Sequence, residues 1–403
     1  MFRVHKVALD LNDRQATYMA KAAGTARFAY NWALAWWRDA YDQWLVDPTS
    51  CDRPTEARAR LHLNMNKSER FAWMYEVTKC APQEAVRDLG RAFTNFFAGR
   101  ASFPVFHRKG ERDSFRLSSG FFKIVGDRLY VSNLGWVKMR EPLRFADAKV
   151  LSVTISKRCG RWFASLACDL PDPTPASRPV NIGGVDVGVG QYATSDGQLN
   201  PVPRAYRAAE KKLKRAQQSL ARKKKGSKNR AKAKAKLARI HGRIADIRSD
   251  WTHKFTRHLV DRYTHIGIED LNVRGMTKNK RLAKSIYDAA FFEFRRQLEY
   301  KAPEVGGHVI VADRWYPSSR LCNQCGAKTK HLPLHTRTWT CQNCGNWHHR
   351  DINAAINLKN LAASSAVTAC EEFSAPDPPS PRPGGPSNLN ETGTRHQRVN
   401  AHV

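Results

Sequence analysis

The sequence predicts a multi-domain protein with a β part, a helical part and an α/β part. Three observations predict this architecture. Aromatic residues recur at helical spacing through residues 12–100, short alternating runs fill residues 103–170, and three apolar strands alternate with helices beyond a proline-rich linker. With 403 residues, the chain is long enough for two or three domains, each with its own core.

The N-terminal region begins with a strand in "FRVHKVAL", residues 2–9, and continues into helices. A helix-bundle core is predicted to hold most of its regularly spaced aromatic residues: Phe28, Trp32, Trp36, Tyr75, Phe93 and Phe97. The runs "RLYVSNLGWVKM", "KVLSVTISKR" and "RWFASLACDL" follow, and they predict a small β-barrel or a curled antiparallel sheet. The stretch "PDPTPASRP", residues 171–179, is typical of a domain linker.

The α/β part has its predicted strands in "NIGGVDVGVG", "THIGIEDL" and "GHVIVAD". Between the last two, "SIYDAAFFEFRRQLEYKA" predicts one helix that Pro303 should end. A short helix is expected in "RDINAAINLKNLAA", residues 350–363. Residues 371–403 are rich in Pro, Gly and Ser, and this composition predicts disorder.

The charge of the chain is unusual, because 68 Lys and Arg against 36 Asp and Glu leave a formal net charge of +32. Such a surplus indicates a polyanionic partner, and nucleic acid fits better than an acidic membrane because no helix has a purely interfacial pattern. Residues 204–243 hold seventeen basic side chains and one acid, Glu210, in a pattern that predicts a long amphipathic helix or a helical hairpin. We expect phosphate contacts from its most basic stretch, Lys223, Lys224, Lys225, Lys228 and Arg230.

The sequence has neither a signal-peptide pattern nor 18 consecutive apolar residues. We therefore expect a soluble, cytoplasmic protein without a membrane partner. In a reducing compartment, five scattered cysteines are expected to act as small buried hydrophobes: Cys51, Cys80, Cys159, Cys168 and Cys370.

The other four cysteines form two Cys-x-x-Cys pairs, Cys322 with Cys325 and Cys341 with Cys344, fifteen residues apart. This spacing predicts one tetrahedral Zn²⁺ held by four thiolates, a structural site with no open position for substrate. A glycine after each pair suits the tight turn of a zinc knuckle. Two disulfides are the alternative, which a cytosolic chain disfavours. The nearby His348 and His349 are then surplus to the zinc. His335 is expected to be a surface histidine, with the role of a ligand in a rearranged site as the alternative.

Three acids stand where a carboxylate has no evident structural purpose. Asp186 lies inside an apolar strand, Glu269 ends the strand "HIGI", and Asp351 opens a helix. Alone, Asp351 would be a helix-capping acid. Buried carboxylates are costly unless they are paired or bind a cation, and three of them on two strands and a helix are what a two-metal phosphodiesterase needs. Together they predict a two-metal site that acts on phosphodiester bonds.

Several blocks in this order resemble the TnpB proteins of bacterial insertion sequences and the related compact type V CRISPR effectors. The blocks are "GVDVGVGQYATSDG", "IGIEDLNVRGM", "FRRQLEYKA", "SSRLCNQCG" and "RTWTCQNCGNWHHRDINAAINL". The similarity also reaches "GTARFAYNWAL", "LGWVKM" and the basic tract, and so covers residues 1–362.

The resemblance implies an RNA-guided DNA endonuclease with a RuvC-like nuclease domain of the RNase H fold. In this family the metal-binding acids match Asp186, Glu269 and Asp351, and the cysteines match a zinc-bearing insert. The implied regions are a β-barrel wedge domain (1–11 and 101–172), a helical recognition lobe (12–100), the nuclease domain (180–315 and 349–364, with a basic hairpin at 204–260), the zinc-binding insert (316–348) and a disordered tail (365–403).

Two positions in the helical region, Lys79 and Gln83, match residues that contact the DNA duplex beside the target in relatives. They could equally form one exposed face of a helix that starts at Pro82. One departure is plain: the family usually has Asp-Arg-Asp at the last motif, and this chain has His349 before Arg350 and Asp351.

The implied partners are a structured guide RNA, one for each protein chain, and double-stranded target DNA that is cut beside a short flanking motif. Two alternatives remain open at this stage. One is an RNA-guided protein that binds DNA without cleaving it, and the other is a transposase that works without RNA.

Overall fold

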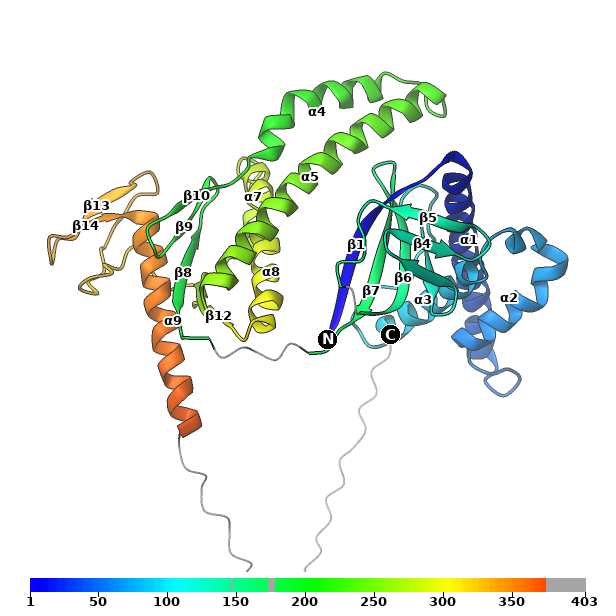
Figure 1. The fold of residues 1–403 in the computed structure, drawn as a ribbon, viewed down its shortest axis with the longest axis horizontal. Coiled ribbons are helices and arrows are strands. Elements are labelled where there is room, and N and C mark those ends of the chain that lie inside the picture. The colour runs from blue at the N-terminus through cyan, green and yellow to red at the C-terminus, as the bar shows by residue number, and fades with distance from the viewer. Residues whose placement is uncertain (146–147, 173–177, 375–403) are drawn as a thin grey trace, which may run out of the picture.

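The computed structural model describes residues 1–145, 148–172 and 178–374, with side chains to residue 366. The chain forms two halves, each with its own sheet and its own hydrophobic core (Figure 1). None of the helices in these ranges has both the length and the apolar character needed to cross a membrane. The disorder predicted for residues 375–403 falls outside the described residues.

The N-terminal half contains an antiparallel sheet of seven strands. The strands are β1 (Phe2–Asp10), β2 (Ser114–Ser118), β3 (Phe122–Val125), β4 (Arg128–Val131), β5 (Gly135–Met139), β6 (Lys149–Arg158) and β7 (Arg161–Asp169), in the order β2-β6-β7-β1-β5-β4-β3. Alternate residues of β7 are buried, as expected for a sheet with one face on a core.

A closed β-barrel is not found within the described residues, because no pairing there joins β2 to β3. Helix α3 (Cys80–Phe97) packs against β2 instead, where Arg116 lies 3.5 Å from Asp88 and the Cys80 thiol lies 3.4 Å from the Ser118 hydroxyl. The antiparallel sheet, which was the alternative interpretation, is the form observed.

The predicted helical region consists of α1 (Asp13–Val46), α2 (Glu56–Arg70), the short 3-10 helix η1 (Ala72–Glu76) and α3. A capping box starts α1. The Asn12 side chain accepts a hydrogen bond from the Gln15 backbone N–H, and the Gln15 side chain accepts one from the Asn12 backbone N–H. Most of the predicted aromatic core packs inward, but Tyr75 and Phe97 are exposed. Helix α3 begins two residues before the predicted start at Pro82.

The C-terminal half contains a sheet of five strands with the order β10-β9-β8-β11-β12. Its strands are β8 (Ile182–Val187), β9 (Gln191–Thr194), β10 (Leu199–Pro201), β11 (His265–Ile268) and β12 (His308–Val311). Strands β8, β11 and β12 run parallel, whereas β9 and β10 are antiparallel to their neighbours. All three predicted strands of the α/β part are therefore present.

Helices cover both faces of this sheet, as Figure 1 shows. Helix α9 (Arg350–Ser374) lies on one face, and α5 (Lys228–Arg262) and α8 (Phe291–Glu304) lie on the other. Strand alternation explains this division, because Gly184 and Gly267 face α9 while Val185 and Ile266 enter the core with α5 and α8. Helix α9 continues to Ser374, so the tail predicted to be disordered from residue 365 is helical over its first ten residues.

The helix predicted over residues 285–302 is two helices. Ala290 has a left-handed backbone (φ 59°) that ends α7 (Ala283–Ala289) and starts α8, and Pro303 lies within the last turn of α8. A short helix, α6 (Val273–Met276), precedes them. The predicted basic hairpin is formed by α4 (Ala205–Ala221) and α5, which project beyond the sheet and pass over the gap between the halves (Figure 1).

Of the scattered cysteines, Cys80 and Cys168 are buried, in agreement with the prediction, whereas Cys51 and Cys159 are partly exposed. The side chain of Cys370 lies outside the described part of the chain.

Candidate metal centres and nucleic-acid interface

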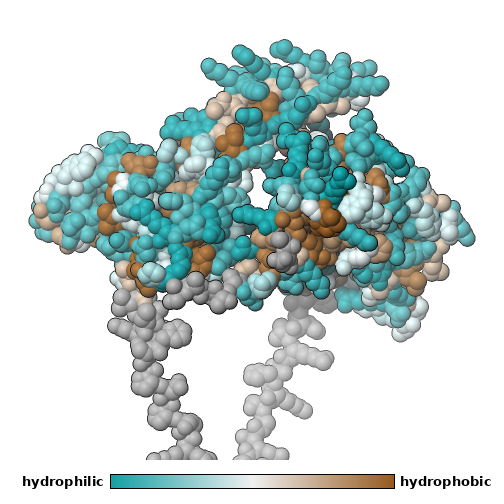
Figure 2. Space-filling view, in the orientation of Figure 1, coloured by the Kyte–Doolittle hydropathy of each residue, from teal (hydrophilic) through white to brown (hydrophobic). Residues whose placement is uncertain are grey.

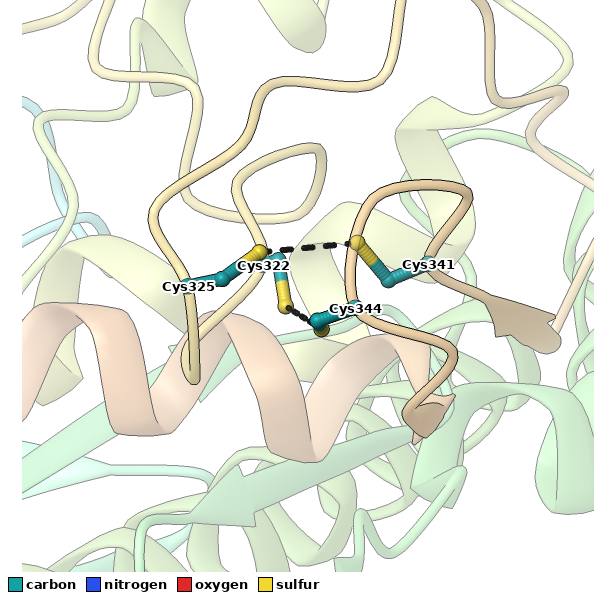
Figure 3. Close-up of side chains that lie close together, drawn as sticks. All are labelled: Cys322, Cys325, Cys341 and Cys344. Carbon is teal, nitrogen blue, oxygen red and sulfur yellow. Dashed lines mark hydrogen bonds between the residues drawn. The ribbon is translucent and has the colours of Figure 1, made fainter.

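Four cysteine thiols gather in the segment between β12 and α9. The Sγ atoms of Cys322, Cys325, Cys341 and Cys344 all lie within 4.8 Å of one another, on two loops beside α9 (Figure 3). The two loops have matching turns: Gly326 and Gly345 have φ values of 72° and 71°, and their N–H groups donate to the carbonyls of Cys322 and Cys341. The glycines therefore serve the turn that the sequence predicted.

The geometry of these thiols fits a metal better than it fits disulfides. The Sγ atoms are 3.6 Å apart for Cys322 and Cys344 and 3.7 Å apart for Cys325 and Cys341, and all four cysteines are free. A Zn–S bond of about 2.3 Å gives a tetrahedron with S···S edges of roughly 3.8 Å. The backbone N–H of Ala327, with the Asn343 side chain, lowers the pKa of Cys325 to about 6, so one ligand favours the thiolate form that a metal requires.

His348 is more than a surplus residue. It lies in β14 (Trp347–His349), is 5% exposed, and places its Nε2 3.1 Å from Cys322 Sγ and its ring against Trp339 of β13 (Thr338–Thr340). A histidine N–H that donates a hydrogen bond to a metal-bound thiolate orients that ligand without binding the metal itself. His335 is exposed, as expected, and the buried Nδ1 of His349 has no hydrogen-bond partner within the described residues.

Strand register brings two of the predicted acids together. Strands β8 and β11 pair in parallel with Val185 opposite Ile268, so Asp186 and Glu269 follow at the same edge of the sheet. Asp351 lies in the first turn of α9, which crosses these two strands. The structure therefore brings all three acids to one end of the sheet, although 165 residues of sequence separate the first from the last.

Two glycines let α9 come close enough for this arrangement. A Cβ at Gly184 would lie 2.0 Å from the Ala355 carbonyl oxygen, and a Cβ at Gly267 would lie 2.2 Å from the Leu358 carbonyl oxygen. Each glycine is two residues before an acid on its strand, so glycine and acid point to the same face. Ala355 is one helical turn after Asp351, and this spacing sets Asp351 over the strand ends.

The pKa of Asp186 reflects its burial and its two acidic neighbours. Burial, with the charges of Glu269 and Asp351, raises the pKa of Asp186 well above its ordinary range. Asp351 is 9% exposed and accepts from Gln191 Nε2 at 3.2 Å and from Arg337 Nη1 at 3.3 Å. Within the described residues, only the four cysteines have ligand atoms that all lie within 4.8 Å of one another. The carboxylate oxygens of the three acids are therefore farther apart than the four thiols are.

A set of buried polar contacts ties the cysteine segment to the acids. Asn353 and Asn357 of α9 are 1% and 2% exposed, and both donate to the carbonyls of Ser318 and Leu321, just before Cys322. The Ser318 hydroxyl donates to Glu269 Oε1. Sequence reasoning missed these residues and Arg337, and the two asparagines in the otherwise apolar stretch INAAINL were the available signal.

Lys79 and Gln83 line one cavity of about 280 Å³ together with Arg60, Asn64 and Lys67. The Lys79 ammonium lies 4.7 Å from the Phe121 ring centroid, at the junction of α3 with the N-terminal sheet. The two residues thus share a basic hollow. Their contact with DNA stays a prediction.

The candidate phosphate contacts of the basic hairpin lie at its tip. Lys223, Lys224, Lys225 and Lys228 are exposed. Arg230 is different, because its Nη1 donates to the carbonyls of Leu220 and Lys223 and so closes the turn between α4 and α5. Figure 2 shows hydrophilic side chains covering this hairpin.

Comparison with protein families gives three matches along the chain. Residues 165–280 match a family described as "Probable transposase" (IS605 OrfB), and residues 291–358 match the "Cas12f1-like, TNB domain". Residues 1–44 match a "Helix-turn-helix domain", although in this structure they form β1 and most of the single long helix α1.

Relatives of similar length include a "Putative RNA-guided DNA endonuclease" of Streptomyces pristinaespiralis, 38% identical over 95% of this chain and 94% of the relative. The Escherichia coli protein InsQ carries the same description and is 33% identical over 91% of this chain and 94% of its own. A solved structure of a Cas12f1–sgRNA–target DNA complex has a similar fold, with a TM-score of 0.50, 13% identity and coverage of 86% of this chain and 83% of that one. The chain belongs to the TnpB family, to which the compact Cas12f1 proteins are related.

Proposed function

We propose that this protein is an RNA-guided DNA endonuclease whose C-terminal half is a RuvC-like nuclease domain of the RNase H fold. One observation carries the proposal: β8, β11 and the first turn of α9 bring Asp186, Glu269 and Asp351 together, and burial with the charges of the other two acids raises the pKa of Asp186. Acids held this close repel one another unless a cation joins them. A sheet of three parallel strands with two antiparallel ones beside them supports the same assignment.

The oxygen donors of the three acids suit Mg²⁺, and the four thiols suit a structural Zn²⁺. Two bound Mg²⁺ would supply an activated water and charge stabilisation at the phosphate. The remaining work belongs to the chain. Gln191 and Arg337 hold the Asp351 carboxylate, Ser318 holds Glu269, and the exposed Arg337 guanidinium offers positive charge beside the acids.

The proposed partners are a guide RNA, one for each chain, and a DNA duplex whose strand pairs with it. The net charge of +32 supports this, as does a cavity of about 730 Å³ between the turn from β6 to β7 and the α4–α5 hairpin. Basic side chains contributed by both halves line it, among them Arg158, Arg161, Lys212 and Arg239. The proposed role of Lys79 and Gln83 is contact with the duplex that flanks the target.

The experiment begins with the RNA that co-purifies with the full chain, which is sequenced to obtain the guide. A plasmid that matches the guide is then offered to the complex with Mg²⁺, beside a plasmid with a mismatched target. We expect cleavage of the matched plasmid alone. Equal cleavage of both plasmids would contradict guidance by RNA.

The same experiment separates the two alternatives. Stable binding of the matched plasmid with no cleavage in Mg²⁺ or Mn²⁺ would support a DNA-binding protein without nuclease activity. Strand joining by RNA-free protein on transposon ends would support an RNA-independent transposase. The three acids at one edge of the sheet favour cleavage over both.

A further inference from the structure

A cavity of about 440 Å³ opens beside Glu269, and the proposed chemistry gives it no task. Its floor is apolar and is formed by side chains of β8, β11 and α8, including the buried Phe294. Its rim carries guanidinium groups, among them Arg274 and Arg296, and the exposed ring of Phe292. An apolar floor under a cationic rim suits a flat, uncharged ring that is attached to a phosphate chain.

The backbone exposes Phe292 at this rim. The left-handed Ala290 breaks the helix, and of the two aromatic residues that follow, Phe291 is 4% exposed and Phe292 is 68% exposed. A large exposed apolar side chain beside a cavity is typical of a binding surface. Rings of this kind form the stacking platforms on which proteins hold single-stranded nucleic acid.

The charges at the rim are not equivalent. Arg295 and Arg314 pair with Asp270, and Arg296 pairs with Glu293. Arg274 is exposed and makes no ion pair within the described residues. The Arg274 guanidinium is therefore available to bind an external anion. On a nucleic acid, the anion closest to a bound base is the neighbouring phosphate of the same strand.

We propose that this cavity binds one unpaired base of the DNA strand presented to Glu269, with Phe292 stacking on the base and Arg274 holding a neighbouring phosphate. This inference rests on the proposed nuclease function and names the side chains that hold one base of the cut strand. In a duplex both faces of a base are covered by its neighbours, so Phe292 can stack only on a base that has left the helix.

Photo-crosslinking tests the contact without requiring cleavage. A single-stranded oligonucleotide with 5-iodouracil is irradiated with the full chain and its co-purified RNA in Ca²⁺, and the joined peptide is identified by mass spectrometry. We expect a crosslink at Phe292 that Phe292→Ala abolishes and Phe292→Trp retains. The control is Phe2→Ala, since Phe2 is 75% exposed and lies on β1 in the other half, and it should leave the crosslink unchanged. A crosslink that persists in Phe292→Ala overturns the proposal.

Kinetics with Mg²⁺ separate this inference from the proposed function. Loss of one stacked base should raise the KM for cleavage of a single-stranded substrate about tenfold in Phe292→Ala, with kcat within about twofold. Cleavage with an unchanged KM overturns the base-binding cavity and leaves the nuclease intact. A crosslink at Phe292 in a protein that does not cleave supports the cavity and overturns the nuclease.

Discussion

Two glycines determine whether Asp351 reaches the other acids. Gly184 and Gly267 lie under the α9 backbone at distances where any side chain would collide with a carbonyl group. Backbone cannot move aside as a flexible side chain can, so relief requires α9 to shift away from the sheet. The glycines therefore act on the candidate site through the position of the helix.

We predict that Gly184→Ala destabilises the protein by about 1–3 kcal/mol and lowers DNA cleavage, because overpacking displaces α9 and Asp351 with it. Thermal melting and a cleavage assay measure the two effects. Gly24→Ala is the matched control, since Gly24 lies inside α1 and a Cβ there would meet only a guanidinium nitrogen, Arg27 Nη2, at 3.8 Å. Equal stability of both variants would show that α9 does not press on the strand.

Lys301 offers a test at the same scale, away from the candidate site. Its side chain is 7% exposed, and its ammonium donates to the carbonyl of His253, to Thr256 Oγ1 and to Gln297 Oε1. Burial, with the charge of Arg257, lowers the pKa of Lys301 from 10.5 to about 8. The folded protein therefore releases this proton at a lower pH than the unfolded chain does.

Between pH 8 and 10.5 the unfolded chain holds a proton on Lys301 that the folded protein has lost, so this residue makes stability rise with pH across that window. We predict that the free energy of unfolding of the wild-type protein rises by about 1–3 kcal/mol relative to that of Lys301→Met between pH 7.5 and 10. Unfolding of both proteins at the two pH values measures this difference. Parallel pH profiles would contradict the account.

The proposed metal-binding acids could be picked out from the sequence, whereas the residues that hold them in place could not. An acid inside an apolar strand conflicts with its surroundings, which made Asp186 visible. The contacts of Ser318, Asn353 and Arg337 depend on how the cysteine segment folds back onto α9, and single-sequence patterns do not encode that path. The contact of His348 with Cys322 also depends on this folding, so the spacing of the cysteines does not reveal it.

At the scale of elements, hydrogen bonds from Asn353 and Asn357 of α9 hold the start of the cysteine segment. Its two loops have only a small hydrophobic core between them. Its small core comprises Cys322, Trp339 and Cys341, with Ala327 and Leu332 packed against them. So small an apolar core favours the proposed zinc as the centre that orders this segment.

We predict that zinc removal, or Cys322→Ser, lowers the melting temperature and reduces DNA cleavage at least tenfold, because Ser318 then loses its fixed place beside Glu269. Elemental analysis should find one zinc for each chain. Cys51→Ser, at a partly exposed cysteine remote from the segment, is the control and should keep both zinc and stability. Unchanged melting after complete zinc removal would contradict a structural role.

The type and order of elements were mostly predictable, and the errors have physical causes. Periodicity located all three strands of the C-terminal sheet, but it cannot reveal whether the N-terminal sheet closes, because closure depends on pairing between distant strands. The break at Ala290 was missed because alanine favours helix, and only tertiary packing explains its left-handed backbone. Helix α9 extends beyond its predicted end at residue 363, because neither glycine nor proline occurs between that residue and Pro376.

At the scale of the whole molecule, ion pairs join the two halves, and the basic α4–α5 hairpin extends over both. Arg3 pairs with Glu304 at 2.8 Å and Arg158 pairs with Asp246 at 3.4 Å, each across the halves. The hairpin places basic side chains over both halves, where a polyanion can neutralise them. Charge composition alone predicted this kind of partner, whereas the placement of the charges required the fold.

The central claim is that Asp186, Glu269 and Asp351 act as one hydrolytic site, and single-turnover cleavage of a guide-matched plasmid tests it most directly. We predict that each alanine variant loses at least about 100-fold in rate, that Asp186→Ala combined with Glu269→Ala loses no more than either alone, and that all variants keep RNA binding. Asp250→Asn, at an exposed acid paired with Lys254, should cleave at the wild-type rate. Wild-type cleavage by Asp186→Ala or by Glu269→Ala would contradict the assignment.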